Sequence, residues 1–220
     1  MKNFIVAIDG PAGSGKSTIA KLIANKYGFT YIDTGAMYRM ITLYCLDNNI
    51  DFENELAMNK VLNNISLDMN EDKFFLNSKE VTKEIREPRV NAKVSKIASI
   101  KAVRENLVKL QRKISEGKNV ILDGRDIGTV VFPDANLKIY LIASPEERAK
   151  RRYKELYQKD TELTYEEVLK SIKDRDYMDS TRKESPLIKA KDAFEFDSTE
   201  KKIEEVLDFI SKKIEEKIRM

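Results

Sequence analysis

The sequence predicts an α/β fold in which helices cover both faces of a parallel sheet. Four short apolar runs, at residues 4–8, 29–32, 120–122 and 138–142, and a last strand pattern at 194–197 alternate with segments of helical periodicity. A glycine-rich segment joins the first run to the first helical pattern, and Asp33 and Asp123 close two of the others. Because ligands of parallel sheets bind beyond the carboxyl ends of the strands, these acidic residues mark the expected site.

The first connection carries the pattern G-x-x-x-x-G-K-S at residues 10–17, between an apolar run and a helical pattern that Gly28 closes. Its glycines allow backbone N–H groups to surround an anion, while the helix start and Lys16 add positive charge. We expect Ser17 to hold Mg²⁺. The segment predicts a nucleoside triphosphate as ligand, and a glycine-rich turn without a ligand is the alternative. The predicted loop consists of Gly10, Pro11, Ala12, Gly13, Ser14, Gly15, Lys16, Ser17 and Thr18.

Composition narrows the classes of function. The 220 residues suffice for one core domain with insertions, and 40 basic against 37 acidic side chains argue against a nucleic-acid partner. The chain has no histidine, which excludes imidazole as a catalytic base or metal ligand. A lone cysteine, Cys45, allows no intramolecular disulfide and is expected to be a small buried residue. We found neither a signal peptide nor a membrane span, so we expect a cytoplasmic protein without a membrane partner.

The run at 29–32 leads into Asp33, Thr34, Tyr38 and Arg39, which should face the same crevice as the glycine-rich loop. Arg39 is either an anion ligand or a solvated helix residue. Helical periodicity at about 53–63 is followed by three short strand patterns at 65–69, 74–77 and 80–82. These predict an antiparallel insert that acts as a lid or specificity module, or else a surface hairpin.

Pro88 should end the last element of the insert, and two helical segments follow between residues 91 and 115. Arg104 lies off the apolar stripe of the second one. The run at 120–122 ends in Asp123, with Arg125 and Asp126 at the same sheet edge. An acidic residue in that place supports Mg²⁺ directly or through water in phosphate-loop proteins.

Two basic helices are expected after the run at 138–142. The first begins at Ser144 and carries a positive face with Arg148, Arg151 and Arg152, about half of it solvated. The second begins with a capping box at Thr164 and contains Arg175, with Arg182 just beyond its end. Separated by residues 158–163, they predict a mobile flap over phosphates. Ser198 should cap the final helix, whose expected packing face consists of Ile203, Val206, Leu207, Ile210 and Ile214.

Arginines from separate segments suggest the chemistry. Arg39, Arg104, Arg125, Arg175 and Arg182 exceed what one triphosphate needs, which predicts a second phosphorylated substrate. Phosphoryl transfer to a phosphate oxygen needs positioning and charge compensation but no strong base, in agreement with the missing histidine.

Four segments together resemble the bacterial-type cytidylate kinase family: residues 10–18, 31–39 (YIDTGAMYR), 123–133 (DGRDIGTVVFP) and 175–187. The resemblance implies a P-loop NTPase-type nucleoside monophosphate kinase fold, with sheet order 2-3-1-4-5 and a small β-insert. It also implies phosphorylation of CMP and dCMP by ATP with Mg²⁺. The implied single domain has its core at about 1–35, 102–145 and 190–220, an acceptor-binding region at about 36–101 and a lid at about 146–189.

The resemblance also implies roles for individual residues. The cytosine edge is read by Ser95, Arg104 and Asp126. The acceptor phosphate is held by Arg39, Arg125 and Arg182, with Arg175 near the phosphates. Tyr38 flanks the base, Asp179 binds the sugar, and Thr34 stands where the family more often has serine. The loop binds ATP together with Arg148 and Arg151. Mg²⁺ is bound by Ser17 and Asp123. The residues implied to catalyse the transfer are Lys16, Arg125, Arg175 and Arg182.

Other readings of the residues stay open. A kinase acting on UMP, AMP or a phosphate-free metabolite fits the same loop and arginines. A regulatory P-loop protein would bind ATP with negligible turnover, and a nucleic-acid-dependent ATPase would show salt-sensitive affinity for DNA or RNA. We expect a monomer.

Overall fold

The computed structural model describes residues 3–70, 72–157 and 163–219. The chain divides into two compact units. The first unit comprises Met1–Ile32 and Ser115–Met220, and the second unit comprises Asp33–Ile114. Each unit is described by itself below. In the described ranges, no helix combines the length and the apolar character that crossing a membrane requires.

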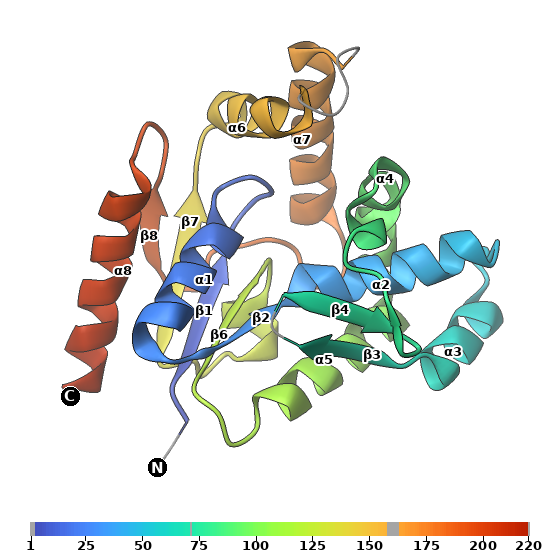
Figure 1. The fold of residues 1–220 in the computed structure, drawn as a ribbon, viewed down its shortest axis with the longest axis horizontal. Helices are drawn as coiled ribbons and strands as arrows, with labels where there is room; N and C mark the ends of the chain where they lie inside the picture. Colours follow the sequence, from blue (N-terminus) through green and yellow to red (C-terminus); the bar gives the residue numbers. More distant parts are fainter. Residues whose placement is uncertain (1–2, 71, 158–162, 220) are drawn as a thin grey trace. The chain divides into compact units, whose positions relative to one another are not determined.

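A five-stranded sheet forms the centre of the first unit (Figure 1). Its strands are β1 (Ile5–Asp9), β2 (Thr30–Asp33), β6 (Val120–Gly124), β7 (Leu137–Ile142) and β8 (Phe194–Asp197), in the order β2-β6-β1-β7-β8. The pairs β1–β6, β1–β7 and β7–β8 are parallel. When the strands of this sheet alone are numbered along the chain, the order is 2-3-1-4-5, which confirms the prediction.

The register of the central strands sets the position of the site. Asp9 at the end of β1 lies opposite Gly124 on one side and Tyr140 on the other. The carboxyl ends of β1 and β6 therefore meet at one edge. The glycine-rich loop leaves this edge from β1, and the segment Arg125-Asp126 leaves it from β6.

Two helices pack on one face of the sheet. Helix α1 (Lys16–Tyr27) contributes Ile19 and Ile23, and α8 (Ile203–Ile218) contributes Val206, Ile210 and Ile214, against buried strand residues such as Val6 and Ile139. The predicted packing face of α8 is wrong at its first residue, because Ile203 is half exposed in the first turn.

The predicted cap of the last helix is also wrong. Helix α8 begins at Ile203, so Ser198 lies too early in the chain to cap it. The Ser198 hydroxyl instead contacts the carbonyl oxygens of Ile142 and Ser14, at 2.9 and 3.2 Å. A turn separates Ser198 from the helix, and Glu205 accepts the Lys202 backbone N–H at the helix start.

Helices α6 (Pro145–Tyr157) and α7 (Tyr165–Thr181) pack on each other through Ala149, Val168 and Ile172. Both predicted helix starts are confirmed. The Glu147 N–H donates to Ser144 Oγ, and Thr164 forms a capping box with Glu167. Residues 158–162 of the predicted flap lie outside the described residues.

The second unit is built around α2 (Thr34–Asp47). Around it lie α3 (Glu55–Asn64), the 3-10 helix η1 (Glu84–Arg86), α4 (Pro88–Ile97) and α5 (Lys101–Ser115). The strands β3 (Leu67–Asn70), β4 (Lys73–Leu76) and β5 (Lys79–Glu80) form an antiparallel sheet, as predicted. Pro88 does not end an element: it begins α4, because a proline at the first helical position loses no intrahelical hydrogen bond.

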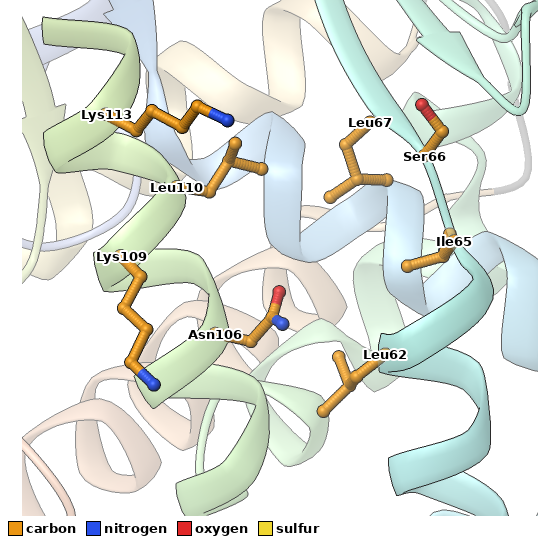
Figure 2. A pocket seen from close by; sticks show the side chains of 8 residues that line it. All are labelled: Leu62, Ile65, Ser66, Leu67, Asn106, Lys109, Leu110 and Lys113. Carbon is orange, nitrogen blue, oxygen red and sulfur yellow. The ribbon is translucent and has the colours of Figure 1, made fainter.

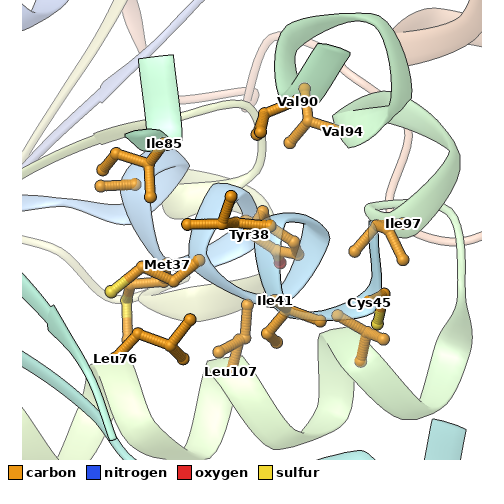
Figure 3. Packing of buried hydrophobic residues seen from close by; sticks show 14 of the residues in the cluster. Met37, Tyr38, Ile41, Cys45, Leu76, Ile85, Val90, Val94, Ile97 and Leu107 are labelled. Atoms are coloured by element: carbon orange, nitrogen blue, oxygen red, sulfur yellow. The ribbon is translucent and has the colours of Figure 1, made fainter. Parts of the chain in front are cut away.

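Figure 3 shows how α2 packs in the second unit. Met37, Tyr38, Ile41 and Cys45 point from α2 into a cluster completed by Leu76, Ile85, Val90, Val94, Ile97 and Leu107. The Cys45 side chain is fully buried, and burial raises the pKa of its thiol to about 11. This confirms the expectation that Cys45 is a packing residue.

Candidate active site

The glycine-rich loop forms a tight turn after β1. A Cβ atom on Gly10 would lie 2.0 Å from the Leu141 carbonyl oxygen, so only glycine fits there. The Lys16 ammonium folds back over the loop and donates to the Pro11 carbonyl at 2.6 Å and to Ser14 Oγ at 3.3 Å. Its side chain is buried. The loop thus places a positive charge beside the backbone that is expected to hold phosphate.

The surroundings of Lys16 disfavour the positive charge of its ammonium group. Burial lowers the pKa of the ammonium well below its usual value, and the Arg125 guanidinium lowers it further. Asp123 and Asp9 oppose these effects by favouring the charged form. A bound anion would act in the same direction as these carboxylates, which is the electrostatic requirement of a phosphate site.

Two hydroxyl groups meet one carboxylate beside the loop. Ser17 Oγ donates to Asp123 Oδ2 at 2.8 Å, and the Tyr31 hydroxyl donates to Asp123 Oδ1 at 2.8 Å. In the described ranges no three histidine, cysteine or acidic residues gather as a metal site. One hydroxyl and one carboxylate still fit Mg²⁺, which commonly binds one or two protein oxygens and takes its other ligands from phosphate and water.

Three arginines of the first unit surround one carboxylate. Arg125 Nε donates to Asp179 Oδ2 at 2.8 Å, and Arg175 Nε lies 3.9 Å from the same oxygen. Burial alone would raise the pKa of Asp179, but Arg125, Arg175 and Arg182 together lower it below its usual value. The Arg182 guanidinium also donates twice to the Ser185 carbonyl. Arginines from separate segments are therefore gathered at Asp179, the residue predicted to bind the sugar.

Arg148 does not belong to a solvated positive face. Its side chain is 3% exposed and pairs with Asp176 of α7 through contacts of 2.6 and 3.0 Å. The same guanidinium donates to the carbonyl oxygens of Ala143 and Ala12. It therefore ties both basic helices to the glycine-rich loop, and Arg148 belongs to the part of the predicted positive face that is not solvated.

Arg151 and Ser198 form a second link to the loop. The Arg151 guanidinium pairs with Glu147 at 3.0 Å and donates to the Ser198 carbonyl at 2.6 Å. The Ser198 hydroxyl in turn lies 3.2 Å from the Ser14 carbonyl oxygen. Sequence reasoning missed the part that Ser198 plays, because a serine before a helix is usually read as a cap.

Asp126 is buried at the start of the π-helical turn η2 (Ile127–Val131). The backbone N–H groups that follow it donate to the carboxylate of Asp9. Sequence reasoning did not include Asp9 in the site. Its only signal was a charged residue at the end of a buried strand.

In the second unit, Asp33 organises the start of α2. Its carboxylate accepts the Ala36 N–H at 2.8 Å and pairs with Arg86 at 2.6 Å. Burial raises the pKa of Asp33, but Arg86 and Arg39 lower it more, so the net pKa lies below the usual value. Thr34 is buried beside this carboxylate. Arg86 is a further residue of this site, and no motif in the sequence predicts its role.

Arg39, Tyr38, Arg104 and Ser95 also belong to the second unit. Arg39 Nε donates to Asn91 Oδ1 at 3.2 Å. The Arg104 guanidinium lies 5.4 Å from the centre of the Tyr38 ring and donates to the Ala98 carbonyl at 2.9 Å. Arg104 is 4% exposed, although it lies off the apolar stripe, and Ser95 is buried on α4. A guanidinium at this distance over an aromatic ring is attracted to it electrostatically.

The second unit has a pocket of about 360 Å³ between α5 and the segment from α3 to β3 (Figure 2). None of the predicted site residues lines it. Its lining consists of Leu62, Ile65, Ser66, Leu67, Asn106, Lys109, Leu110 and Lys113.

Comparisons with known proteins agree with this description. A family model described as cytidylate kinase matches residues 6–216. A cytidylate kinase of Fusobacterium nucleatum is 68% identical, covering 98% of this chain and 99% of the relative. Cytidylate kinases of Caldanaerobacter subterraneus and Clostridioides difficile are 55% and 50% identical, with coverage of 92% and 97% of this chain and 91% and 99% of the relatives.

A crystal structure of an uncharacterized protein from Eubacterium ventriosum shares the fold, with a TM-score of 0.57 at 13% identity. The alignment covers 98% of this chain and 99% of that chain. The family model and the relatives match nearly the whole chain, including the loop and the arginine-bearing segments described above. The chain belongs to the cytidylate kinase family.

Proposed function

We propose that this chain transfers the γ-phosphoryl group of ATP to the phosphate of CMP and dCMP, giving ADP and CDP or dCDP. The observation that carries the proposal is the family match over residues 6–216, joined to a complete phosphate loop with a buried lysine. ATP is the phosphoryl donor of this kinase family. The substrates are small molecules, and we propose that the enzyme is a cytoplasmic monomer.

On the donor side, the backbone N–H groups of residues 10–17 bind the β- and γ-phosphates, and Lys16 compensates their charge. The contacts of Arg148 with Ala12 and of Ser198 with Ser14 support a loop that is held in place before ATP arrives. Arg148 and Arg151 assist ATP binding by holding this loop. Ser17 and Asp123 would hold Mg²⁺, which when bound neutralises phosphate charge.

On the acceptor side, Arg39, Arg125 and Arg182 bind the phosphate of the monophosphate, and Arg175 offsets charge on the group in transfer. The gathering of Arg125, Arg175 and Arg182 at Asp179 supports these roles. Guanidinium groups stay charged and bind phosphate oxygens bidentately. The attacking oxygen is already ionised near neutral pH, so the chain needs no histidine as a base.

The base is read by hydrogen bonds. Asp126 accepts from the exocyclic amine of cytosine, which uracil lacks, while Arg104 and Ser95 donate to the ring acceptors. Tyr38 and Thr34 flank the nucleotide, and Asp179 binds the sugar. The position of the Arg104 guanidinium over the Tyr38 ring, together with its hydrogen bond to the Ala98 carbonyl, supports this role. We propose an acceptor-binding region at about 36–101 and a lid at about 146–189 on one kinase domain.

The test is a coupled assay of ADP formation with ATP, Mg²⁺ and one acceptor at a time. CMP and dCMP should support turnover, whereas UMP and AMP should support little. The variant Lys16→Ala is the control. If the activity came from a contaminating kinase, a preparation of this variant would be as active as the wild type. A preference for UMP or AMP would refute the proposed substrate, and ATP binding without turnover on any acceptor would refute the proposed reaction.

A further inference from the structure

The turn that carries Asp126 is held by a side chain from another strand. In η2, the Val130 N–H donates to the Asp126 carbonyl at 2.8 Å, which closes the turn. The first N–H groups of any helical turn have no acceptor within it. Here the N–H groups of Ile127 and Gly128 donate to Asp9 Oδ1 and Oδ2, at 2.8 and 2.7 Å. Asp9 thus caps the turn from the end of β1.

The surroundings of this cap leave it little freedom. Asp9 is 5% exposed. A Cβ atom on Gly128 would lie 3.1 Å from Lys138 Cδ and 3.4 Å from Asp9 Oδ2, so the turn packs closely on both side chains. The Lys138 ammonium donates to the Pro133 carbonyl just beyond the turn and to Asp192 at 2.8 Å. The segment between β6 and β7 is therefore fastened near both of its ends.

We propose that Asp9 is a positioning residue for acceptor recognition: by holding the first turn of η2, it fixes the backbone from which Arg125 and Asp126 project. This inference rests on the proposed function, in which these two residues bind the phosphate and the base of the acceptor. The position of Asp9 at the end of β1, one residue before the glycine-rich loop, ties the acceptor-reading turn to the strand that carries the donor loop.

The chemistry of the cap explains why a carboxylate is needed. Two N–H donors require two acceptor oxygens, and an ionised carboxylate supplies both without a donor of its own. An asparagine of the same shape offers one oxygen and one NH₂ group. Its NH₂ group would face a backbone N–H, so the turn must shift to escape the contact between two donors. The substitution Asp9→Asn therefore changes hydrogen bonding with almost no change in volume.

Asp9 also favours the charged form of Lys16, which suggests an alternative role on the donor side. The two roles differ in their kinetic signature. A positioning role predicts a higher KM for CMP and a weaker preference for CMP over UMP, with the KM for ATP nearly unchanged. A role through Lys16 predicts a higher KM for ATP and no change in base preference.

The experiment compares steady-state kinetics of the wild type with Asp9→Asn, Gly128→Ala and a control, Asp134→Asn. Losing one charge-assisted hydrogen bond should raise the KM for CMP about tenfold in Asp9→Asn, with a similar loss of preference over UMP. Gly128→Ala pushes the same turn with a methyl group and should show the same signature. Asp134 is exposed on the connection after η2, so its substitution should change neither constant.

The inference is overturned if folded Asp9→Asn keeps both the KM for CMP and the base preference within twofold of the wild type, or if the KM for ATP rises as much as that for CMP. If Asp9→Asn does not fold, as judged by thermal melting, Gly128→Ala decides the same comparison. Wild-type activity on a different monophosphate would refute the proposed substrate instead. In that case Asp9→Asn must still raise the KM of the monophosphate that is used.

Discussion

Removing the carboxylate of Asp176 should leave the buried positive charge of Arg148 without its carboxylate partner. The Arg148 side chain is 3% exposed in the wild type, and among the described residues Asp176→Ala would leave its guanidinium the carbonyl partners Ala143 and Ala12. Breaking a buried pair in this way costs about 3–5 kcal/mol. Because the Asp176 side chain is 26% exposed, water can replace part of its contribution, and we expect about 3 kcal/mol. For a chain of this size that corresponds to a melting temperature lower by roughly 6–12 °C.

Thermal melting followed by circular dichroism measures this effect. Asp174→Ala is the matched control, since Asp174 lies exposed on the same helix, and it should stay within about 0.5 kcal/mol of the wild type. The double variant Arg148→Met, Asp176→Ala removes the stranded charge and should recover part of the loss. A melting temperature of Asp176→Ala equal to that of the control, or no recovery in the double variant, would refute the reasoning.

The remaining predictions concern transfer, base choice, metal and pH. Lys16→Ala should lower kcat about a hundredfold or more while the chain stays folded, measured by ADP formation and melting. Asp126→Asn should relax the preference for CMP over UMP more than it raises the KM for ATP, and an unchanged CMP-to-UMP ratio would contradict the assigned role. Removal of Mg²⁺ by EDTA should abolish turnover, and added Mg²⁺ should restore it. Burial raises the pKa of Asp9 from 3.8 to about 6, against the opposing N–H groups of Gly128 and Ile127; Asp126 raises it further and Lys16 lowers it. The folded state therefore binds this proton more tightly than the unfolded state, and the contribution of Asp9 to stability grows as pH falls through about 6. Urea unfolding measures this effect: the free energy of unfolding of the wild type, minus that of Asp9→Asn, should increase by about 1 kcal/mol from pH 7 to pH 5. A decrease of this difference would contradict the prediction.

The order of the elements was predictable because it depends on local patterns. Apolar runs predict four of the five strands of the sheet. The capping box at Thr164 predicts a helix start because Thr164 and Glu167, which form its hydrogen bonds, lie only three residues apart. The predictions of element boundaries were wrong where one residue type can serve two purposes. Pro88 is predicted to end an element but begins α4 just after the 3-10 helix η1, and Ser198 resembles a cap while its hydroxyl contacts carbonyl oxygens of other segments.

The site was predictable where a motif contains its own chemistry, as in the glycine-rich loop. It was not predictable where a residue acts through a distant partner. Arg148 and Asp176 lie 28 positions apart, and Asp9 and Ile127 lie 118 apart. Nothing in the local sequence distinguishes Arg148 from the solvated Arg152 one turn later. Only the packing of α6 on α7 decides which of the two is buried.

These contacts explain why the chain has nearly equal numbers of basic and acidic residues. Most positive groups near the proposed phosphate sites have a carboxylate close by: Lys16 has Asp123 and Asp9, Arg125 has Asp179, and Arg148 has Asp176. Without such partners, burying several cations together would cost more free energy than a domain can supply. With them, the guanidinium groups are held in defined orientations at a tolerable cost. We therefore expect a phosphate that enters such a site to compete with an internal carboxylate for each cation, to bind more weakly than the number of arginines alone suggests, and to be released more easily as product.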